Sequence, residues 1–264
     1  MNVATGQFAV CPDWATNLQC CRQLMALAVN EGASLLVLPE AVLARDNGDP
    51  GYAARQAQQP DGPFLSGIRE ASLCYPELAT VFTVHVQIAD GQVPNRLFVV
   101  QGGAILCQYD KLHLYDAFAM QESRLVTAGH LIPPLFSLGD MRVGVMTCYD
   151  LRFPDLAMSL ALAGADILVV PAAWVKGPAK EHHWATLLAA RALDTTCYVV
   201  ASGECGERNT GLSRVIDPMG ITIASAGESA GLVISQVSKQ RIAAVRAQLP
   251  VLENRRFVPP VLNV

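Results

Sequence analysis

Apolar residues in the first part of the chain follow two patterns, one with the period of an α-helix and one typical of buried β-strands. Between 13 and 31 they recur at intervals of three and four, which predicts a helix with one buried face that ends at Gly32. The next run, 35–38, is entirely apolar, as expected of a short strand covered on both faces, and it stops at Pro39. Glu40 is therefore predicted to lie just past the end of a buried strand.

A different strand pattern follows. Residues 79–88 alternate between apolar and more polar positions, which predicts a strand with one covered face. Two short apolar runs, 97–100 and 104–109, flank a Gly-Gly pair that readily supplies the positive φ angles of a tight hairpin. Lys111 lies just beyond the second of these strands.

The second half of the chain continues the alternation of strands and helices. Residues 142–147 predict a strand, and Pro154 near a first helical turn predicts a helix, so Cys148 falls in the short turn between them. This succession of elements predicts a layered α/β sandwich. The further elements are strand 167–170, helix 181–195, strand 198–201, strands around Val215 and Ile223, and strand 232–237.

Two stretches resemble each other, 31–39 and 163–171. Each contains a helix end, a glycine turn and a buried strand that stops at proline, which suggests an internal two-fold repeat, although chance similarity between α/β units explains it equally well. The end of the chain, from about residue 250, contains prolines and has no periodicity, so we expect an extended arm. Such an arm packs either on a partner subunit or on its own domain.

Composition narrows the classes of function. A chain of 264 residues, 52% of them hydrophobic, is expected to bury one core, so we predict a single domain over 1–264. The net charge of -4 and the absence of a Lys/Arg cluster argue against nucleic acid as a partner. The N-terminus has no secretory pattern, which favours a cytoplasmic location. The most apolar region, 157–175, is interrupted by Gly164, Asp166 and Pro171, so no membrane segment is predicted.

The cysteines give no sign of a metal site. The chain has eight, with no CxxC pair and no histidine at a zinc-site spacing, so we predict neither a metal nor another cofactor. A cytosolic protein would keep these thiols reduced, and most are expected to be small buried residues.

Glu40, Lys111 and Cys148 form a candidate site because each follows a predicted strand, the position where ligands bind in open α/β sheets. A thiol with an ordinary pKa is mostly protonated at neutral pH, so a cysteine enzyme supplies a base or a positive field. Glu40 is the candidate base and Lys111 the candidate cation. Each residue alone has an ordinary explanation, as a core cysteine, a solvated carboxylate or a surface lysine, and only the combination favours an active site.

The residues around Cys148 add to this hypothesis. The cysteine precedes a predicted helix, whose free N–H groups and dipole favour a thiolate and an oxyanion, and the N–H of Tyr149 is the natural donor. Asp150 and Arg152 are assigned structural roles, because charged residues at a helix start more often brace the turn.

Three motifs resemble the nitrilase, or carbon-nitrogen hydrolase, superfamily: Leu-Pro-Glu at 38–40, Tyr-Asp-Lys-Leu-His-Leu at 109–114 and Met-Thr-Cys-Tyr-Asp-Leu-Arg-Phe-Pro at 146–154. They occur in order, and Pro-Ala-Ala-Trp at 171–174 supports them. The likeness continues through 183–184, 187–192 and 217–220, so it covers essentially the whole chain.

The resemblance implies a four-layer α-β-β-α sandwich that pairs with a second copy, giving a homodimer or a higher homo-oligomer. It also implies a catalytic triad of Glu40, Lys111 and Cys148 with an additional glutamate, which Glu122 matches; an ordinary loop carboxylate is the alternative for Glu122. In the implied mechanism Glu40 takes the thiol proton, Lys111 and the N–H of Tyr149 hold the oxyanion, and Glu122 keeps Lys111 charged and oriented.

Within the family, the run 148–153 and the compact length look most similar to deaminated glutathione amidases and ω-amidases, and Tyr149 with 206–211 favours the former. The implied reaction splits the amide between a 2-oxoglutaryl unit and cysteinylglycine through a cysteine thioester. An ω-amidase acting on 2-oxoglutaramate, another small-amide or ureido hydrolase, and a catalytically silent binding protein remain alternatives. The candidate substrate-binding residues are Tyr149, Ala173, Trp174 and Arg208, the last of which is equally well explained as a surface arginine.

Overall fold

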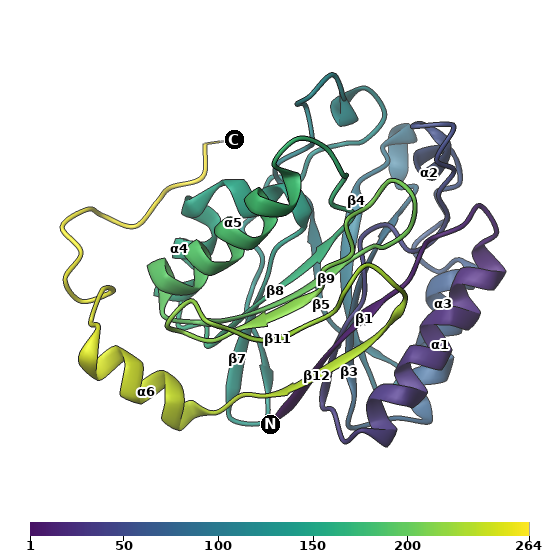
Figure 1. Cartoon of the computed structure of the whole chain (residues 1–264). Helices are drawn as coiled ribbons and strands as arrows, with labels where there is room; N and C mark the ends of the chain where they lie inside the picture. The colour runs from purple at the N-terminus through teal and green to yellow at the C-terminus, as the bar shows by residue number, and fades with distance from the viewer. Residues whose placement is uncertain (264) are drawn as a thin grey trace.

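Two β-sheets, each of six strands, pack face to face in the computed structural model, which describes residues 1–263 and, at Asp90, only the backbone (Figure 1). In spatial order the first sheet contains β12 (Gly231–Gln236), β1 (Asn2–Gln7), β2 (Leu35–Val37), β3 (Ala79–His85), β4 (Asn95–Gln101) and β5 (Ala104–Asp110). The second contains β11 (Thr222–Ser225), β10 (Arg214–Ile216), β9 (Tyr198–Gly203), β8 (Ile167–Ala172), β7 (Met141–Val145) and β6 (Phe136–Leu138).

Helices cover the outer face of each sheet, so the molecule has the four layers that the family resemblance implies (Figure 1). On the first sheet lie α1 (Trp14–Asn30) and α3 (Pro63–Leu73), and on the second lie α4 (Pro154–Leu162) and α5 (Lys180–Thr195). The smaller helices are α2 (Tyr52–Arg55), α6 (Lys239–Gln248) and the 3-10 helices η1 (Ala89–Gly91), η2 (Glu122–Arg124) and η3 (Cys148–Arg152).

Alternation along the strands divides their side chains between two cores. In and just after β2, Leu35 and Val37 belong to the core between the sheets, whereas Leu36 and Leu38 belong to the core under α1 and α3. β2 is therefore covered on both faces, as its unbroken apolar run predicts.

The prediction of a half-covered strand over 79–88 was wrong. β3 ends at His85, and all seven of its residues are buried. Its more polar side faces the second sheet rather than solvent, and Thr83 there accepts a hydrogen bond from the N–H of Ala41 at 2.7 Å. A polar side chain that is paired in this way remains buried at little cost.

The other predicted elements lie close to their expected positions. The side chain of Asp13 caps α1 by accepting from the N–H of Thr16 at 3.0 Å. Gly102 and Gly103 form the turn between β4 and β5 with φ angles of 52° and 79°. The sequence did not reveal β1, α3, β6 or α6. β1 is rich in small and polar residues, and α6 buries only Ile242 and Val245, so neither has a clear apolar pattern.

The two sheets share one topology, which supports the internal repeat. β1, β2 and β3 are parallel and joined through α1 and α3, while β7, β8 and β9 are parallel and joined through α4 and α5. In each sheet an antiparallel strand flanks the first of the three, β12 in one case and β6 in the other. Two further antiparallel strands continue from the third, namely β4 and β5, or β10 and β11.

The apolar region 157–175 divides between α4 and β8, and none of the helices within 1–263 has the length and apolar character of a membrane span. All eight cysteines are free, and five are buried, as expected. Beyond α6 the chain runs without helix or strand through residue 263 and leaves the body of the molecule (Figure 1).

Candidate active site

Four strand ends meet at one place between the two sheets. Glu40 follows β2, Lys111 follows β5, Cys148 follows β7, and Ala173 follows β8. The first two strands belong to one sheet and the last two to the other. The structure thus brings together Glu40, Lys111 and Cys148, the three catalytic candidates from the sequence.

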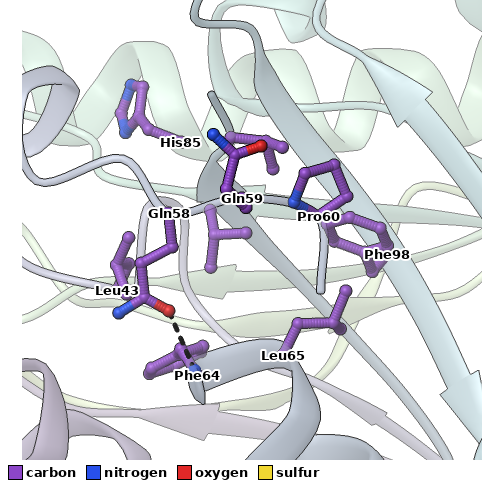
Figure 2. Close-up of a pocket in the computed structure, with 10 residues that line it drawn as sticks. Leu43, Gln58, Gln59, Pro60, Phe64, Leu65, His85 and Phe98 are labelled. Atoms are coloured by element: carbon purple, nitrogen blue, oxygen red, sulfur yellow. Dashed lines mark hydrogen bonds between the residues drawn. The ribbon is translucent and has the colours of Figure 1, made fainter. Parts of the chain in front are cut away.

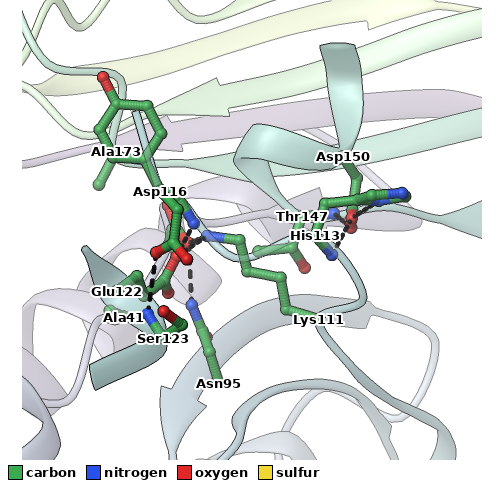
Figure 3. Close-up of polar contacts among 12 residues, drawn as sticks. Ala41, Asn95, Lys111, His113, Asp116, Glu122, Ser123, Thr147, Asp150 and Ala173 are labelled. Atoms are coloured by element: carbon green, nitrogen blue, oxygen red, sulfur yellow. Dashed lines mark hydrogen bonds and ion pairs between the residues drawn. The ribbon is translucent and has the colours of Figure 1, made fainter. Parts of the chain in front are cut away.

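The Glu40 carboxylate is buried and fully held by hydrogen bonds. Its Oε1 lies 2.9 Å from Lys111 Nζ and accepts from Asn95 Nδ2 at 2.8 Å, while its Oε2 accepts from the N–H of Ala173 at 3.0 Å. Figure 3 shows Asn95, Lys111 and Ala173 converging there. Burial tends to raise the pKa of Glu40, but the adjacent Lys111 ammonium outweighs it and lowers that pKa to about 2.

Lys111 lies between two carboxylates. Its Nζ is 2.9 Å from Glu40 Oε1 and 2.9 Å from Glu122 Oε2, and only 2% of its side chain is exposed. Glu122 Oε2 also accepts from the N–H of Tyr115 at 2.6 Å. Burial tends to lower the pKa of Lys111, but the Glu122 and Glu40 charges raise it well above its ordinary value, so the ammonium persists. Glu122 is thus the second carboxylate in contact with the Lys111 ammonium.

Cys148 is held at a strained turn. Its φ angle is 44°, in the left-handed region that a non-glycine residue adopts only when its surroundings impose it. Asp150 braces the turn: its Oδ2 accepts from the N–H of Thr147 at 2.8 Å, and its Oδ1 accepts from the N–H of His113 at 3.1 Å (Figure 3). Its Oδ2 also accepts from Tyr109 Oη at 2.8 Å. The structural role predicted for Asp150 is confirmed.

The Cys148 thiol is neutral in the unliganded site. Burial and the neighbouring Glu40 carboxylate raise its pKa well above the ordinary value, and Lys111 opposes them only in part. Cys148 is itself the first residue of the five-residue 3-10 helix η3, rather than preceding a long helix. The site thus pairs a protonated thiol with an ionised carboxylate.

Two hollows meet at Cys148. The larger is a cavity of about 390 Å³, lined by Glu40, Arg45, Lys111 and Glu122 among others. The smaller, of about 20 Å³, is lined by Tyr115, Cys148, Tyr149, Arg152, Ala173, Trp174, Val175 and Lys180. Three of the four predicted substrate-binding residues, namely Tyr149, Ala173 and Trp174, therefore line the wall beside the cysteine.

Arg208, the fourth, does not line either hollow. It is exposed, and its guanidinium donates to the backbone carbonyl of Asn47. Figure 2 shows a separate pocket between β3 and α3 that includes Gln58, Phe64 and His85. Its mainly apolar lining includes none of Glu40, Lys111 and Cys148, so it is a poor candidate for a reaction site.

Sequence reasoning missed Arg45 and Asn95. Arg45 donates to the backbone carbonyl of Glu40 at 3.2 Å and pairs with Glu204 at 2.8 Å, while Asn95 holds Glu40 from the adjoining strand. The pairing of β3 with β4 sets Asn95 opposite His85 at the cavity. The sequence alone shows neither this register nor the path of the loop that carries Arg45.

The comparisons with known proteins decide the family. The family profile "Carbon-nitrogen hydrolase" matches residues 2–247. The chain belongs to the carbon-nitrogen hydrolase family. It is 56% identical to a deaminated glutathione amidase of Escherichia coli O157:H7, over 99% of this chain and 100% of that protein, and 36% identical to a deaminated glutathione amidase of Synechocystis, over 94% and 95%.

A solved structure supports the fold of this carbon-nitrogen hydrolase. A superfamily member from Xanthomonas campestris, 26% identical, superposes with a TM-score of 0.85 over 98% of both chains. The predicted family and the predicted α/β sandwich are thus confirmed. The family and the amidase relatives also support the prediction of a hydrolase that acts on carbon-nitrogen bonds other than peptide bonds.

Proposed function

We propose that this carbon-nitrogen hydrolase is a deaminated glutathione amidase that works through a thioester on Cys148. The observation that carries the proposal is the pairing of the buried Cys148 thiol with Glu40, whose carboxylate is kept ionised by Lys111. The high identity to the Escherichia coli amidase along the whole chain supports the choice of substrate.

In the first half-reaction, Glu40 takes the thiol proton as the sulfur attacks the amide carbonyl carbon. The carbonyl electrons move onto oxygen, and Lys111 with the N–H of Tyr149 stabilises that oxyanion. When the oxyanion collapses, the carbon-nitrogen bond breaks, and protonated Glu40 gives its proton to the departing amine. Cysteinylglycine leaves, and a 2-oxoglutaryl thioester remains on Cys148.

In the second half-reaction, Glu40 removes a proton from water as the water oxygen attacks the thioester carbon. The carbon-sulfur bond then breaks, the sulfur regains a proton from Glu40, and 2-oxoglutarate is released. Glu122 keeps Lys111 charged and oriented in both steps, because its carboxylate lies 2.9 Å from the ammonium. Glu40 thus acts alternately as base and acid.

The surroundings of Cys148 support a substrate with acidic ends. Arg45 and Arg124 line the larger cavity, and Arg152 and Lys180 line the smaller hollow. Deaminated glutathione carries a carboxylate on each side of the bond that breaks. Cations on both sides of the cysteine complement such a molecule.

The test compares deaminated glutathione, 2-oxoglutaramate, β-ureidopropionate and a simple nitrile as substrates. We expect the highest kcat/KM for deaminated glutathione, together with a 2-oxoglutaryl adduct in the intact mass of the enzyme. Cys148→Ala is expected to stay folded and to lose turnover, whereas Cys74→Ala, which changes an exposed cysteine, keeps it. Undiminished activity of Cys148→Ala would end the proposal, and faster turnover of 2-oxoglutaramate would make the enzyme an ω-amidase.

We further propose that the enzyme is a single-domain homodimer that works in the cytoplasm. Apolar side chains of the C-terminal segment support an assembly, since Phe257, Val258 and Val261 are 86%, 81% and 89% exposed. Light scattering tests the dimer against the 28.2 kDa mass of one chain, and cell fractionation tests the location.

A further inference from the structure

The smaller hollow beside Cys148 contains two cations that have no carboxylate partner. Arg152 is the last residue of η3, and Lys180 is the first residue of α5. Within residues 1–263, no acidic side chain that the structure describes forms an ion pair with either of them. Cations taken partly out of water are normally paired, so this arrangement suits an anionic group of a ligand.

Aromatic rings hold both cations over the hollow. Arg152 Cζ lies 4.7 Å from the centre of the Trp174 ring, and Lys180 Nζ lies 3.8 Å from the centre of the Phe118 ring. Such cation-π contacts stabilise the charges but leave their N–H donors free for a ligand.

The donors that remain can take an oxyanion. Lys180 Nζ gives one hydrogen bond to Tyr115 Oη at 2.7 Å, and an ammonium has three to give. Arg152 Nη2 lies 3.4 Å from His183 Nδ1, and its Nε is buried and has no acceptor among the described residues. A carboxylate in the hollow would accept from the two remaining N–H groups of Lys180 and lie next to the Arg152 guanidinium charge.

Electrostatics favour the same conclusion. Burial and the neighbouring Arg152 guanidinium lower the pKa of Lys180, which shows that the two cations repel each other. An anion between them would remove that repulsion.

The position of Glu40 relative to Cys148 decides which part of the substrate lies in the smaller hollow. Glu40 lines only the larger cavity, whereas Cys148 lines both spaces. Because Glu40 gives its proton to the departing amine, the amine lies in the larger cavity. The acyl chain extends to the other side of Cys148, where Arg152 and Lys180 lie.

We propose that Lys180, with Arg152 beside it, binds the carboxylate at the far end of the acyl group and so selects acyl donors that carry an acid there. This inference rests on the proposed function, because it takes Cys148 as the residue that carries the acyl group. For a 2-oxoglutaryl group, Lys180 would meet the 2-oxo acid end, which presents a carboxylate and a keto oxygen as acceptors.

A purely structural role for Lys180 is the competing explanation, since its contacts with Tyr115 and Phe118 hold the loop over the site. Lys180→Met removes the charge and keeps the bulk, and Lys180→Arg keeps the charge. Tyr115→Phe removes the loop contact and leaves the ammonium. Lys176→Met, at an exposed position in the same segment, is the matched control.

The first experiment compares glutaramate with pentanamide, in which a methyl group replaces the far carboxylate. In Lys180→Met, we expect kcat/KM for glutaramate to fall about 10- to 100-fold, as for the loss of a charge-assisted hydrogen bond, with pentanamide changed little. Lys180→Arg, Tyr115→Phe and Lys176→Met should keep most of the ratio between the two substrates. If Lys180→Met leaves the ratio of kcat/KM for glutaramate to that for pentanamide unchanged, the proposal is wrong.

The second experiment measures binding of 2-oxoglutarate to Cys148→Ala by calorimetry, so it needs no turnover. We expect Lys180→Met in that background to weaken binding about 10-fold or more. If Cys148 forms no thioester but binding still depends on Lys180, the proposed function fails and the carboxylate subsite stands. If the thioester forms and Lys180→Met does not weaken the binding of 2-oxoglutarate, only the proposal of the carboxylate subsite is wrong.

Discussion

The two halves of the fold share one order of strands and helices, yet they place different chemistry at equivalent strand ends. Alignment of the two strands that stop at proline makes Glu40 in the first half equivalent to Ala172 in the second. The registers of the neighbouring strands extend this correspondence: Phe8 is equivalent to Cys148. The base thus belongs to one half and the nucleophile to the other.

This difference shows why neither half is a site alone. The first sheet supplies Glu40 and Lys111, and the second supplies Cys148 and the N–H of Ala173, which meets Glu40 at 3.0 Å. The geometry of the reaction therefore depends on how the two sheets pack. A buried interface that is densely packed fixes such distances well.

The largest effect is expected from Glu40→Gln, which removes the base from the first half. Glutamine cannot take the thiol proton, so kcat should fall about 10²- to 10⁴-fold, and no acyl-enzyme should accumulate in intact mass spectra. Glu31→Gln, at the exposed end of α1, is the control. Rapid acylation of Glu40→Gln would move the base elsewhere, with Glu204 of the second half as the first carboxylate to examine.

The next largest effect is expected from Lys111→Met, which should lower the free energy of unfolding. The substitution leaves the buried Glu40 carboxylate and the half-buried Glu122 carboxylate without their shared cation, and breaking a buried pair typically costs about 3–5 kcal/mol. Denaturant unfolding measures the loss. Adding Glu122→Gln should recover part of it by removing one of the two charges, and a double variant no more stable than Lys111→Met would contradict the shared-cation arrangement.

The sequence predicted the strand ends of the site better than its surroundings. Glu40, Lys111 and Cys148 follow apolar runs or a Gly-Gly turn, and both signals are local along the chain. Asn95 and Lys180 reach the site through strand register and helix placement, which depend on contacts between distant segments. The rise in the pKa of Cys148 depends on folding in a similar way, because burial and the nearby Glu40 charge arise only in the folded chain.

The pairing of β3 with β2 and of β9 with β8 makes His85 equivalent to Glu204 in the second half. The smallest effect that we expect is a difference between these two residues in the pH dependence of stability. Burial, with Arg45 and Lys111 nearby, lowers the pKa of His85 from 6.5 to about 4, so between these values the unfolded chain binds a proton that the folded chain does not. Stability linked to His85 therefore falls as pH drops from 6.5 to 4, by a few kcal/mol at most, and His85→Asn should flatten this slope.

Glu204 should act in the opposite direction. Burial raises its pKa, so protonation favours the folded state as pH falls through that value, and Glu204→Gln should make the acid-side loss of stability steeper above pH 4.5. Urea unfolding at a series of pH values measures both slopes, with the exposed His130→Asn as the control. We therefore expect opposite changes at two equivalent positions of the repeat. If His85→Asn and Glu204→Gln change the slope of stability against pH in the same direction, local burial and charge do not govern the difference between the halves.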